Sequence, residues 1–441
     1  MKRAIVHLKK LLVFMLVAMG VTACIDEVDL RITSTAQERK ILIVEGTLTN
    51  EFKNHQIRLS QIDSLIDLQL DSVYNPFTPL RDIERNLVNY EENAQVRVEV
   101  STGAAINFIE VSPGLYESST AFAAESNTNY SLKVTTTNGK SFSSKAMTIT
   151  GFSNLDSIYA DTTISDSGAE GIGIFVDNSN AQGAAGNLRY DYSETYKVIA
   201  PNWSPQEFKL TNYDPCALPA PTYDLEIVPR EKEQQVCYAT AQSNTIIQNQ
   251  LNAGEGGGST GFLVRFLGKD NFSISHRYSI LVRQLVSGPE SFSFYEQLNN
   301  FSQTGSIFSQ VQPGFLEGNL RADDGSKGTV IGFFDVVSVA QKRLFFNYTD
   351  FYPDEELPPY PFNCGLHSSP ETHVSYCATG EQMNNCPQSV IERVNLDLIS
   401  YVAPNDQNIG TCPGPHIYVP KICGDCRVLG SNVEPEFWTE D

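Results

Sequence analysis

Apolar and polar residues alternate with a period of two along much of the first third of the chain. The segments with this pattern are KILIVEGTLTN (40–50), HQIRLSQ (55–61), QVRVEVSTG (95–103), INFIEVSPGLYES (106–118) and NYSLKVTTTNGKSFSS (129–144). Successive side chains of a strand point to opposite faces, so this pattern predicts antiparallel strands with one buried face. Asn138-Gly139 predicts a tight hairpin with a type I′ turn. Together these strands predict a β-sandwich over residues 39–151.

The connection from Ile62 to Glu92 is longer and more irregular than a hairpin needs. Loops of this length are often functional or mobile.

A second strand-rich region begins at about residue 152. Its segments are GIGIFVDN, LRYDYSETYKVIA, GFLVRFLG, RYSILVRQLV, GTVIGFFDVV and KRLFFNYTD. The sequence does not alternate strands and helices as a parallel α/β fold does. We therefore predict a mainly β protein, with a larger β-rich domain over residues 152–441.

One short helix interrupts this second region. Ser287-Gly288-Pro289-Glu290 supplies a capping residue, a first-turn proline and an acid. The residues that then recur at helical spacing are Phe292, Tyr295, Leu298 and Phe301. Such an aromatic stripe is more often core than ligand platform, and we interpret it as core.

The N-terminus has the pattern of a bacterial export signal. MKRAIVHLKK is positively charged, and Leu11–Val21 is apolar but too short to span a bilayer. Thr22 and Ala23 then lead into Cys24, and VTAC resembles a lipobox. We expect a signal peptide over residues 1–23, a lipid on Cys24 and a tether over 24–38. The alternative is an ordinary signal peptide with an incidental Cys24.

The chain is strongly acidic, which limits its partners. It carries 31 Lys and Arg against 52 Asp and Glu, for a net charge of −21. Removal of the leader deletes only basic residues and makes the remainder more acidic. Such a surface repels nucleic acid and anionic headgroups, so we expect no nucleic-acid partner and attachment to the membrane through the lipid alone.

The remaining cysteines predict disulfides, because an exported chain meets an oxidising compartment. They are Cys216, Cys237, Cys364, Cys377, Cys386, Cys412, Cys423 and Cys426. The pairing cannot be read from the sequence, although Cys216 with Cys237 is the most economical local bridge. Most of the set lies after residue 370, where disulfides would compensate for a thin core.

Three motifs resemble catalytic or metal sites, and each has a simpler interpretation. Gly257-Gly258-Ser259-Thr260-Gly261 matches the G-x-S-x-G elbow, but no α/β pattern surrounds it, so we interpret it as a loop. Cys423-Gly-Asp-Cys426 has the spacing of a thioredoxin-type redox pair, but lacks a βαβ unit, so we interpret it as structural. The third motif is a set of potential zinc ligands: Cys364, His367, Glu371, His373 and Cys377. For it we favour a disulfide with incidental histidines.

Two further features leave alternatives open. Phe437 and Trp438 form an apolar plug near the C-terminus, which we expect to pack on the second domain rather than bind a ligand. Carboxylates are numerous, and the sequence singles out no pair at glycosidase separation. We therefore expect no enzymatic activity and no cofactor.

A family resemblance rests on several segments taken together. They are the lipobox, ILIVEGTLTN, SPGLYESS with NYSLKVTTTNGKSF, CYATAQSNTII, RYSILVRQLVSGPESFSFYEQL, EGNLRADDGSKGTVIGFFDVVSVAQKRLFF and CGDCRVLGSNVEPEFW. From Cys24 to Trp438 the chain resembles the lipoprotein family called domain of unknown function 4249, and the closing motif is the most specific piece. The stretches around Cys216, Cys377, Cys386 and Cys412 are additional to the family's usual cysteines, so its pairing does not transfer.

The resemblance implies a function and a location. Members of the family are outer-membrane lipoproteins of Bacteroidota, often encoded beside a TonB-dependent transporter, with no assigned catalytic residues. The resemblance also implies that the β-sandwich predicted over residues 39–151 is immunoglobulin-like. Asp26 and Glu27, directly after Cys24, resemble the signal that sends such lipoproteins to the cell surface. We expect a binding accessory of a transporter β-barrel in nutrient uptake; the alternatives are a surface adhesin or envelope-assembly component and, third, a surface hydrolase.

Overall fold

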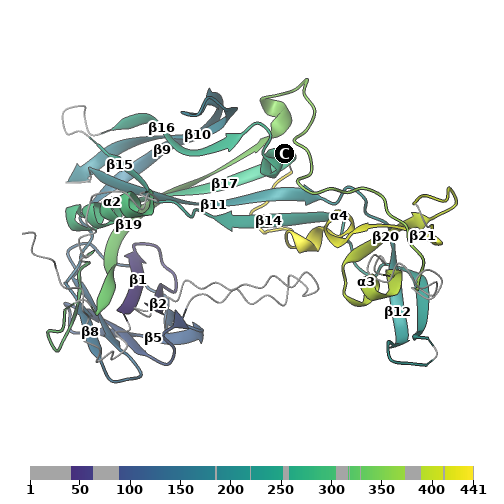
Figure 1. Ribbon diagram of the computed structural model, residues 1–441. Coiled ribbons are helices and arrows are strands. Elements are labelled where there is room, and N and C mark those ends of the chain that lie inside the picture. Colours follow the sequence, from purple (N-terminus) through teal and green to yellow (C-terminus); the bar gives the residue numbers. More distant parts are fainter. Residues whose placement is uncertain are drawn as a thin grey trace, which may run out of the picture.

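The protein is mainly β-strand with few helices, which confirms the predicted fold class. The computed structural model describes residues 41–62, 89–183, 186–218, 220–251, 258–303, 316, 318–327, 329–372, 389–410 and 413–440. The strands form two bodies at one end of the molecule and a group of hairpins at the other, as Figure 1 shows. The signal peptide (1–23) and the tether (24–38) lie outside the described residues and stay predictions.

The N-terminal body is a curved sheet that folds around its own core. Its strands are β1 (Ile41–Thr49), β2 (Gln56–Ile62), β3 (Asn89–Tyr90), β4 (Gln95–Val100), β5 (Ala105–Ser112), β6 (Leu115–Ser118), β7 (Tyr130–Thr135) and β8 (Ser141–Ser144). They follow the order β1-β2-β6-β5-β4-β7-β8, with β3 against β2. Alternate residues face inward, and Leu42, Val44 and Leu48 of β1 are all buried. The strands predicted in this region are confirmed.

The hairpin at Asn138-Gly139 is confirmed, but the prediction of a type I′ turn is wrong. Gly139 has a φ of 81°, whereas Asn138 does not have positive φ, which a type I′ turn requires. The N–H of Gly139 donates to the carbonyl of Thr136, and the N–H of Thr136 donates to the carbonyl of Lys140, each at 2.9 Å. The connection is therefore a three-residue loop that ends on a left-handed glycine.

A single long strand, β19 (Val330–Asn347), joins the two bodies. It runs parallel to β1 until Val337 lies opposite Thr49, and from Ser338 onward it pairs antiparallel with β17 (Arg277–Val286). The segments GTVIGFFDVV and KRLFFNYTD, predicted as separate strands, are therefore parts of one strand. Because β19 changes partner without a break, the sheet of one body continues into the sheet of the other.

The curved sheet of the N-terminal body is completed by residues from late in the chain. Strand β18 (Leu320–Ala322) pairs with β8. Just before it, the side chain of Asn319 exchanges two hydrogen bonds, of 2.7 and 2.9 Å, with the backbone of Phe334 in β19. The two ends of the sheet thus meet around one core. The predicted division at residue 152 did not anticipate that β18 and Asn319 would pack on the N-terminal body. This division and the immunoglobulin-like assignment of the first domain both stay predictions.

The second body is a sandwich of two layers. One layer is β16 (Ser259–Gly268), β10 (Glu170–Gly183) and β9 (Gly151–Ile164). The other is β14 (Val236–Gln242), β11 (Asn187–Ile199), β17 and the second half of β19, with β15 (Ile247–Gln250) against β11. Buried residues such as Ile174 of β10, Tyr190 of β11 and Ile280 of β17 pack between the layers. Strand β9 begins beside the predicted boundary at residue 152.

The predicted helix is α2 (Pro289–Gln303), and it begins at the expected proline. In the described part of the chain, two shorter helices lie away from α2, toward the other end of the molecule (Figure 1): α3 (Val390–Asn395) and α4 (Lys421–Gly424). Short 3₁₀ helices lie at Phe272–Ile274, Tyr348–Asp350 and Cys426–Val428. Among the described residues, no helix is long and apolar enough to cross a membrane.

The far end consists of two hairpins with a small core. They are β12 (Gln206–Asp214) with β13 (Thr222–Pro229), and β20 (Ile399–Pro404) with β21 (His416–Pro420). Val390 of α3, Ile399 and Tyr418 form the buried part of the cluster between them. Figure 1 shows this group at a distance from the N-terminal body. So small a core needs other restraints, and the disulfides described below lie beside it.

Candidate functional site

Within the part of the chain that the structure describes, a cavity with a volume of about 980 Å³ lies where the two bodies join. One wall is the sheet that runs through β1, β19, β17 and β11. The opposite wall is α2, through Phe294, Tyr295 and Leu298, and residues 243–246 contribute at the side. We call this space the junction cavity.

Strand alternation explains which side chains reach the junction cavity. On β11, Leu188 and Tyr190 point into the sandwich core, so Arg189 and Asp191 point to the opposite face. On β17, Arg283 reaches the cavity in the same way, between residues of the sandwich core. The face of the sheet that the sandwich leaves uncovered therefore carries charged groups.

Charged side chains form a network of ion pairs at one side of the junction cavity. Arg283 lies directly opposite Asp191 in the strand pairing, and its Nη1 is 3.2 Å from Asp191 Oδ2. Its Nη2 is 2.7 Å from Glu51 Oε2, to which Lys53 Nζ also donates at 2.6 Å. Burial raises the pKa of Glu51, but Lys53 and Arg283 outweigh it and hold the pKa at about 2. Arg283 and Lys53 are thus occupied by carboxylates of the protein.

Arg189 also lines the cavity, but its guanidinium contacts an aromatic ring. Its guanidinium lies over the ring of Tyr295, 3.9 Å from the centroid, and its Nε is buried without a hydrogen-bond partner. Within the part of the chain that the structure describes, no carboxylate lies within ion-pair distance of it. Burial lowers the pKa of Arg189, but Tyr295 and Asp335 outweigh it, so the group stays charged.

Asp335 fixes α2 over the cavity. It is buried in β19, accepts a hydrogen bond from the hydroxyl of Ser291 in the first turn of α2, and has a pKa raised by burial. At the other side, Gln248 Nε2 donates to the carbonyl of Phe292 at 2.8 Å. Lys145 pairs with Glu290 at 2.9 Å on the surface. The helix is therefore attached to both bodies.

The aromatic stripe of α2 was interpreted as core, and this is wrong for two of its members. Tyr295 and Leu298 line the junction cavity, while Phe294, which was not in the stripe, is buried against Phe333 at 5.4 Å. The helix covers a charged sheet face instead of entering a core, so its inner side is only partly packed. The side chain of Phe301 lies outside the described residues.

His55 also lines the cavity, but it is a structural residue. Its ring is buried, and its Nε2 is 3.0 Å from the carbonyl oxygen of Phe122. Burial lowers its pKa to about 4, so the ring is neutral at physiological pH.

The structure shows two disulfides, and neither is the predicted local bridge. Cys237 pairs with Cys426, and Cys364 with Cys423, at Cα separations of 5.5 and 5.6 Å. Cys216 is free and exposed, so the Cys216–Cys237 interpretation is wrong. The partners are far apart in sequence, by 189 and 59 residues, and proximity along the chain misled the inference.

The other predicted cysteine positions lie outside the described residues. They are Cys24, the lipidation candidate, and Cys377, Cys386 and Cys412.

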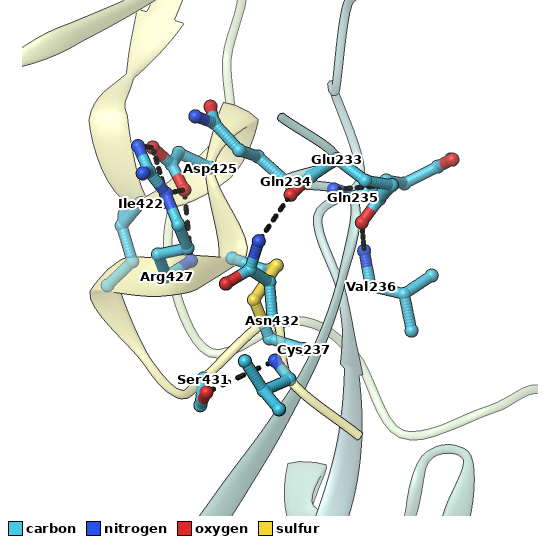
Figure 2. The surroundings of a disulfide bond; sticks show 12 residues. Glu233, Gln234, Gln235, Val236, Cys237, Ile422, Asp425, Arg427, Ser431 and Asn432 are labelled. Carbon is cyan, nitrogen blue, oxygen red and sulfur yellow. Dashed lines mark hydrogen bonds and ion pairs between the residues drawn. A yellow bond between two sulfur atoms is a disulfide. The ribbon is translucent and has the colours of Figure 1, made fainter. Parts of the chain in front are cut away.

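Cys423 and Cys426 are bonded to different partners, not to each other, so in this structure they do not form a CxxC redox pair. Figure 2 shows the surroundings of the Cys237 disulfide. Asp425, between the two cysteines, is buried and binds Arg427 at 2.7 Å. Asn432 donates to the carbonyl of Glu233 at 2.8 Å. The motif therefore fastens the C-terminal segment to β14 and its preceding loop.

The candidate zinc ligands are dispersed. Cys364 is in a disulfide, and Glu371 accepts from the hydroxyl of Tyr223 at 3.0 Å. His367 exchanges backbone hydrogen bonds with Tyr418. His373 and Cys377 lie outside the described residues. Among the described residues no three such groups converge on one point.

Ser259 of the G-x-S-x-G match is the first residue of β16, not part of a loop as predicted. Its hydroxyl accepts from Asn249 Nδ2 at 3.3 Å. The antiparallel strand that follows it is not the strand-to-helix turn of a nucleophile elbow.

The C-terminal tail packs on the second body, as expected. Trp438 is buried against Tyr238 and Phe345, at 4.9 and 5.7 Å between ring centroids. The guanidinium of Arg343 lies 3.6 Å from the ring centroid of Phe437.

The sequence reasoning did not single out Arg189, Asp191 and Arg283, which line the cavity. A signal was present, because charged residues interrupt the apolar strands LRYDY and ILVRQLV at positions of one face. Such positions on a strand with a buried opposite face indicate a second, partly covered surface.

A comparison with protein families finds a match. A family model described as domain of unknown function (DUF4249) matches residues 25–343. The closing CGDC segment, on which the resemblance relied most, lies beyond this match. A search of curated proteins finds no match.

Proposed function

The chain belongs to the DUF4249 family, and from this premise we propose that it is a surface-exposed outer-membrane lipoprotein. It serves as a binding accessory of a TonB-dependent transporter in nutrient uptake and catalyses no reaction itself. An immunoglobulin-like N-terminal body is part of the same proposal.

The junction cavity is the observation that carries the binding role. A volume of about 980 Å³ is at the upper end of small-molecule sites, which are typically about 300–1,000 Å³. Such sites combine an apolar lining with a few placed polar groups. Here Phe294 and Leu298 supply the apolar part, and Arg189 supplies a charge.

The anchoring role is supported by the N-terminal sequence. The apolar leader ends in VTAC, and Asp26 and Glu27 follow Cys24. A single acyl chain holds a protein only marginally, whereas two or three give stable attachment, as lipoprotein processing supplies.

Affinity purification from membranes tests the partnership. The full chain, carrying a C-terminal tag, is extracted in mild detergent, and a β-barrel protein is expected to co-purify. Cys24→Ala is the control, because the variant should leave the membrane fraction and lose the partner. Recovery of the wild-type chain as a lone monomer contradicts the proposal and favours an adhesin or envelope-assembly component.

A further inference from the structure

We propose that the junction cavity binds a small organic anion with an apolar body, whose charged group pairs with Arg189. This inference deepens the proposed function by naming the class of ligand. It depends on the cavity and not on the identity of the transporter.

The cations around the cavity differ in what they contact. Arg283 is bound by Asp191 and Glu51, and Lys53 is bound by Glu51. Arg58 is an exposed side chain opposite Glu45 in the strand pairing. Among the described residues, Arg189 is the lining cation that combines a buried polar atom with no bound carboxylate.

Arg189 is a half-buried arginine whose buried Nε has no hydrogen-bond partner, and a guanidinium in this position suits an anion. A buried charge is destabilising unless it is paired and hydrogen-bonded. The carboxylates that act on Arg189 are Asp335, which burial makes harder to ionise, and Asp191, which is held by Arg283. Tyr295 contributes the face of its ring and a side-chain hydrogen bond, but no negative charge at neutral pH. The planar fork of the guanidinium suits a carboxylate, sulfate or phosphate group.

The apolar residues that line the cavity indicate the chemistry of the uncharged part of the ligand. Phe294 of α2 packs against Phe333 of β19, and both line the cavity together with Leu298 of α2 and Leu285 of β17. Leu285 lies directly opposite Arg189 in the strand pairing, so the charge and the apolar wall are neighbours. A ligand that fills both needs a single charged end and an apolar body. The acidic surface of the chain, with a net charge of −21, disfavours large polyanions and leaves small singly charged molecules.

Calorimetric titration of the purified full chain tests the proposal. The probes are 4-phenylbutyrate and its neutral analogue 4-phenylbutan-1-ol. We expect the acid to bind at least about tenfold more tightly than the alcohol, because a hydrogen bond to a charged group is typically worth at least that factor. Arg189→Gln should remove this preference and leave the alcohol unaffected. Arg97→Gln is the matched control, since Arg97 is an exposed arginine on β4, paired with Glu99 away from the cavity.

Other results overturn the proposal. They are equal binding of acid and alcohol, binding of neither at millimolar concentration, and an Arg189→Gln variant that keeps the wild-type preference. If Arg189→Gln fails to fold, Leu298→Trp provides the test. The larger side chain fills the space beside the apolar wall and should abolish binding of both probes. Unchanged binding by this variant contradicts the proposed site. The titration uses no transporter, so its failure is distinct from failure of the co-purification.

Discussion

Arg283, on the wall of the junction cavity, compensates two carboxylates, Glu51 and Asp191. Its side chain is 24% exposed, so the interaction is only partly screened by solvent. We predict that Arg283→Met lowers the free energy of unfolding by about 1–3 kcal/mol, because removal of one partner leaves uncompensated charge in a partly buried site. Arg97→Met, which breaks an exposed pair, should cost less than about 0.5 kcal/mol. Urea denaturation measures both, and equal effects would contradict the assignment.

The lowered pKa of Glu51 predicts that acid removes its contribution to the stability of the protein. Its pKa falls from 4.5 to about 2 on folding, so its contribution is present above pH 4.5 and is lost as the pH falls toward 2. Asp191 acts in the opposite sense, because burial raises its pKa. The stability difference between wild type and Glu51→Gln should therefore shrink between pH 4.5 and 2. A difference that stays constant over that window in denaturation at stepped pH would argue against the network.

At the scale of elements, the parallel pairing of β1 with β19 depends on Gly332. Its φ is 136°, and an added Cβ would lie 2.0 Å from the carbonyl oxygen of Val44. We predict that Gly332→Ala costs about 2–5 kcal/mol, through backbone strain and overpacking. Gly139→Ala is the control: φ is also positive, but nothing lies within 4 Å, so the cost should be about 1–2 kcal/mol. Thermal unfolding that ranks the two variants in the opposite order would contradict the packing argument.

The elements themselves could largely be predicted from the sequence, but their assembly could not. The period of two located β1, β2, β4 and β7, because it depends only on local alternation, and strand-like segments located β10, β11, β16 and β17. The parallel pairing of Leu42 with Val330 joins residues from opposite parts of the chain, and no local pattern encodes it. The charged positions in LRYDY and ILVRQLV were a local signal, but no local pattern shows that α2 covers them to form a cavity. Arg189 and Tyr295 belong to elements that look ordinary until the fold brings them together.

At the scale of the whole molecule, disulfides fasten the C-terminal segment to the second body and to the hairpins. The Cys237–Cys426 bond closes a loop across a separation of 189 residues. We predict that Cys237→Ser with Cys426→Ser lowers stability by about 2–5 kcal/mol, as loss of a native disulfide typically does. Cys216→Ser should change nothing, because Cys216 is exposed and unbonded. Differential scanning calorimetry under non-reducing conditions compares the variants, and a destabilised Cys216→Ser would contradict the observed pairing.

The proposed function rests on a lipid on Cys24 that would attach the chain to the membrane, and the proposed partnership depends on it. Mass spectrometry of the N-terminal peptide from protein extracted from membranes tests it most directly. The account predicts a mature chain that begins at Cys24 and carries a diacylglyceryl thioether. An N-terminus at any other residue, or an unmodified thiol on Cys24, would contradict the proposed anchor and with it the role at the cell surface.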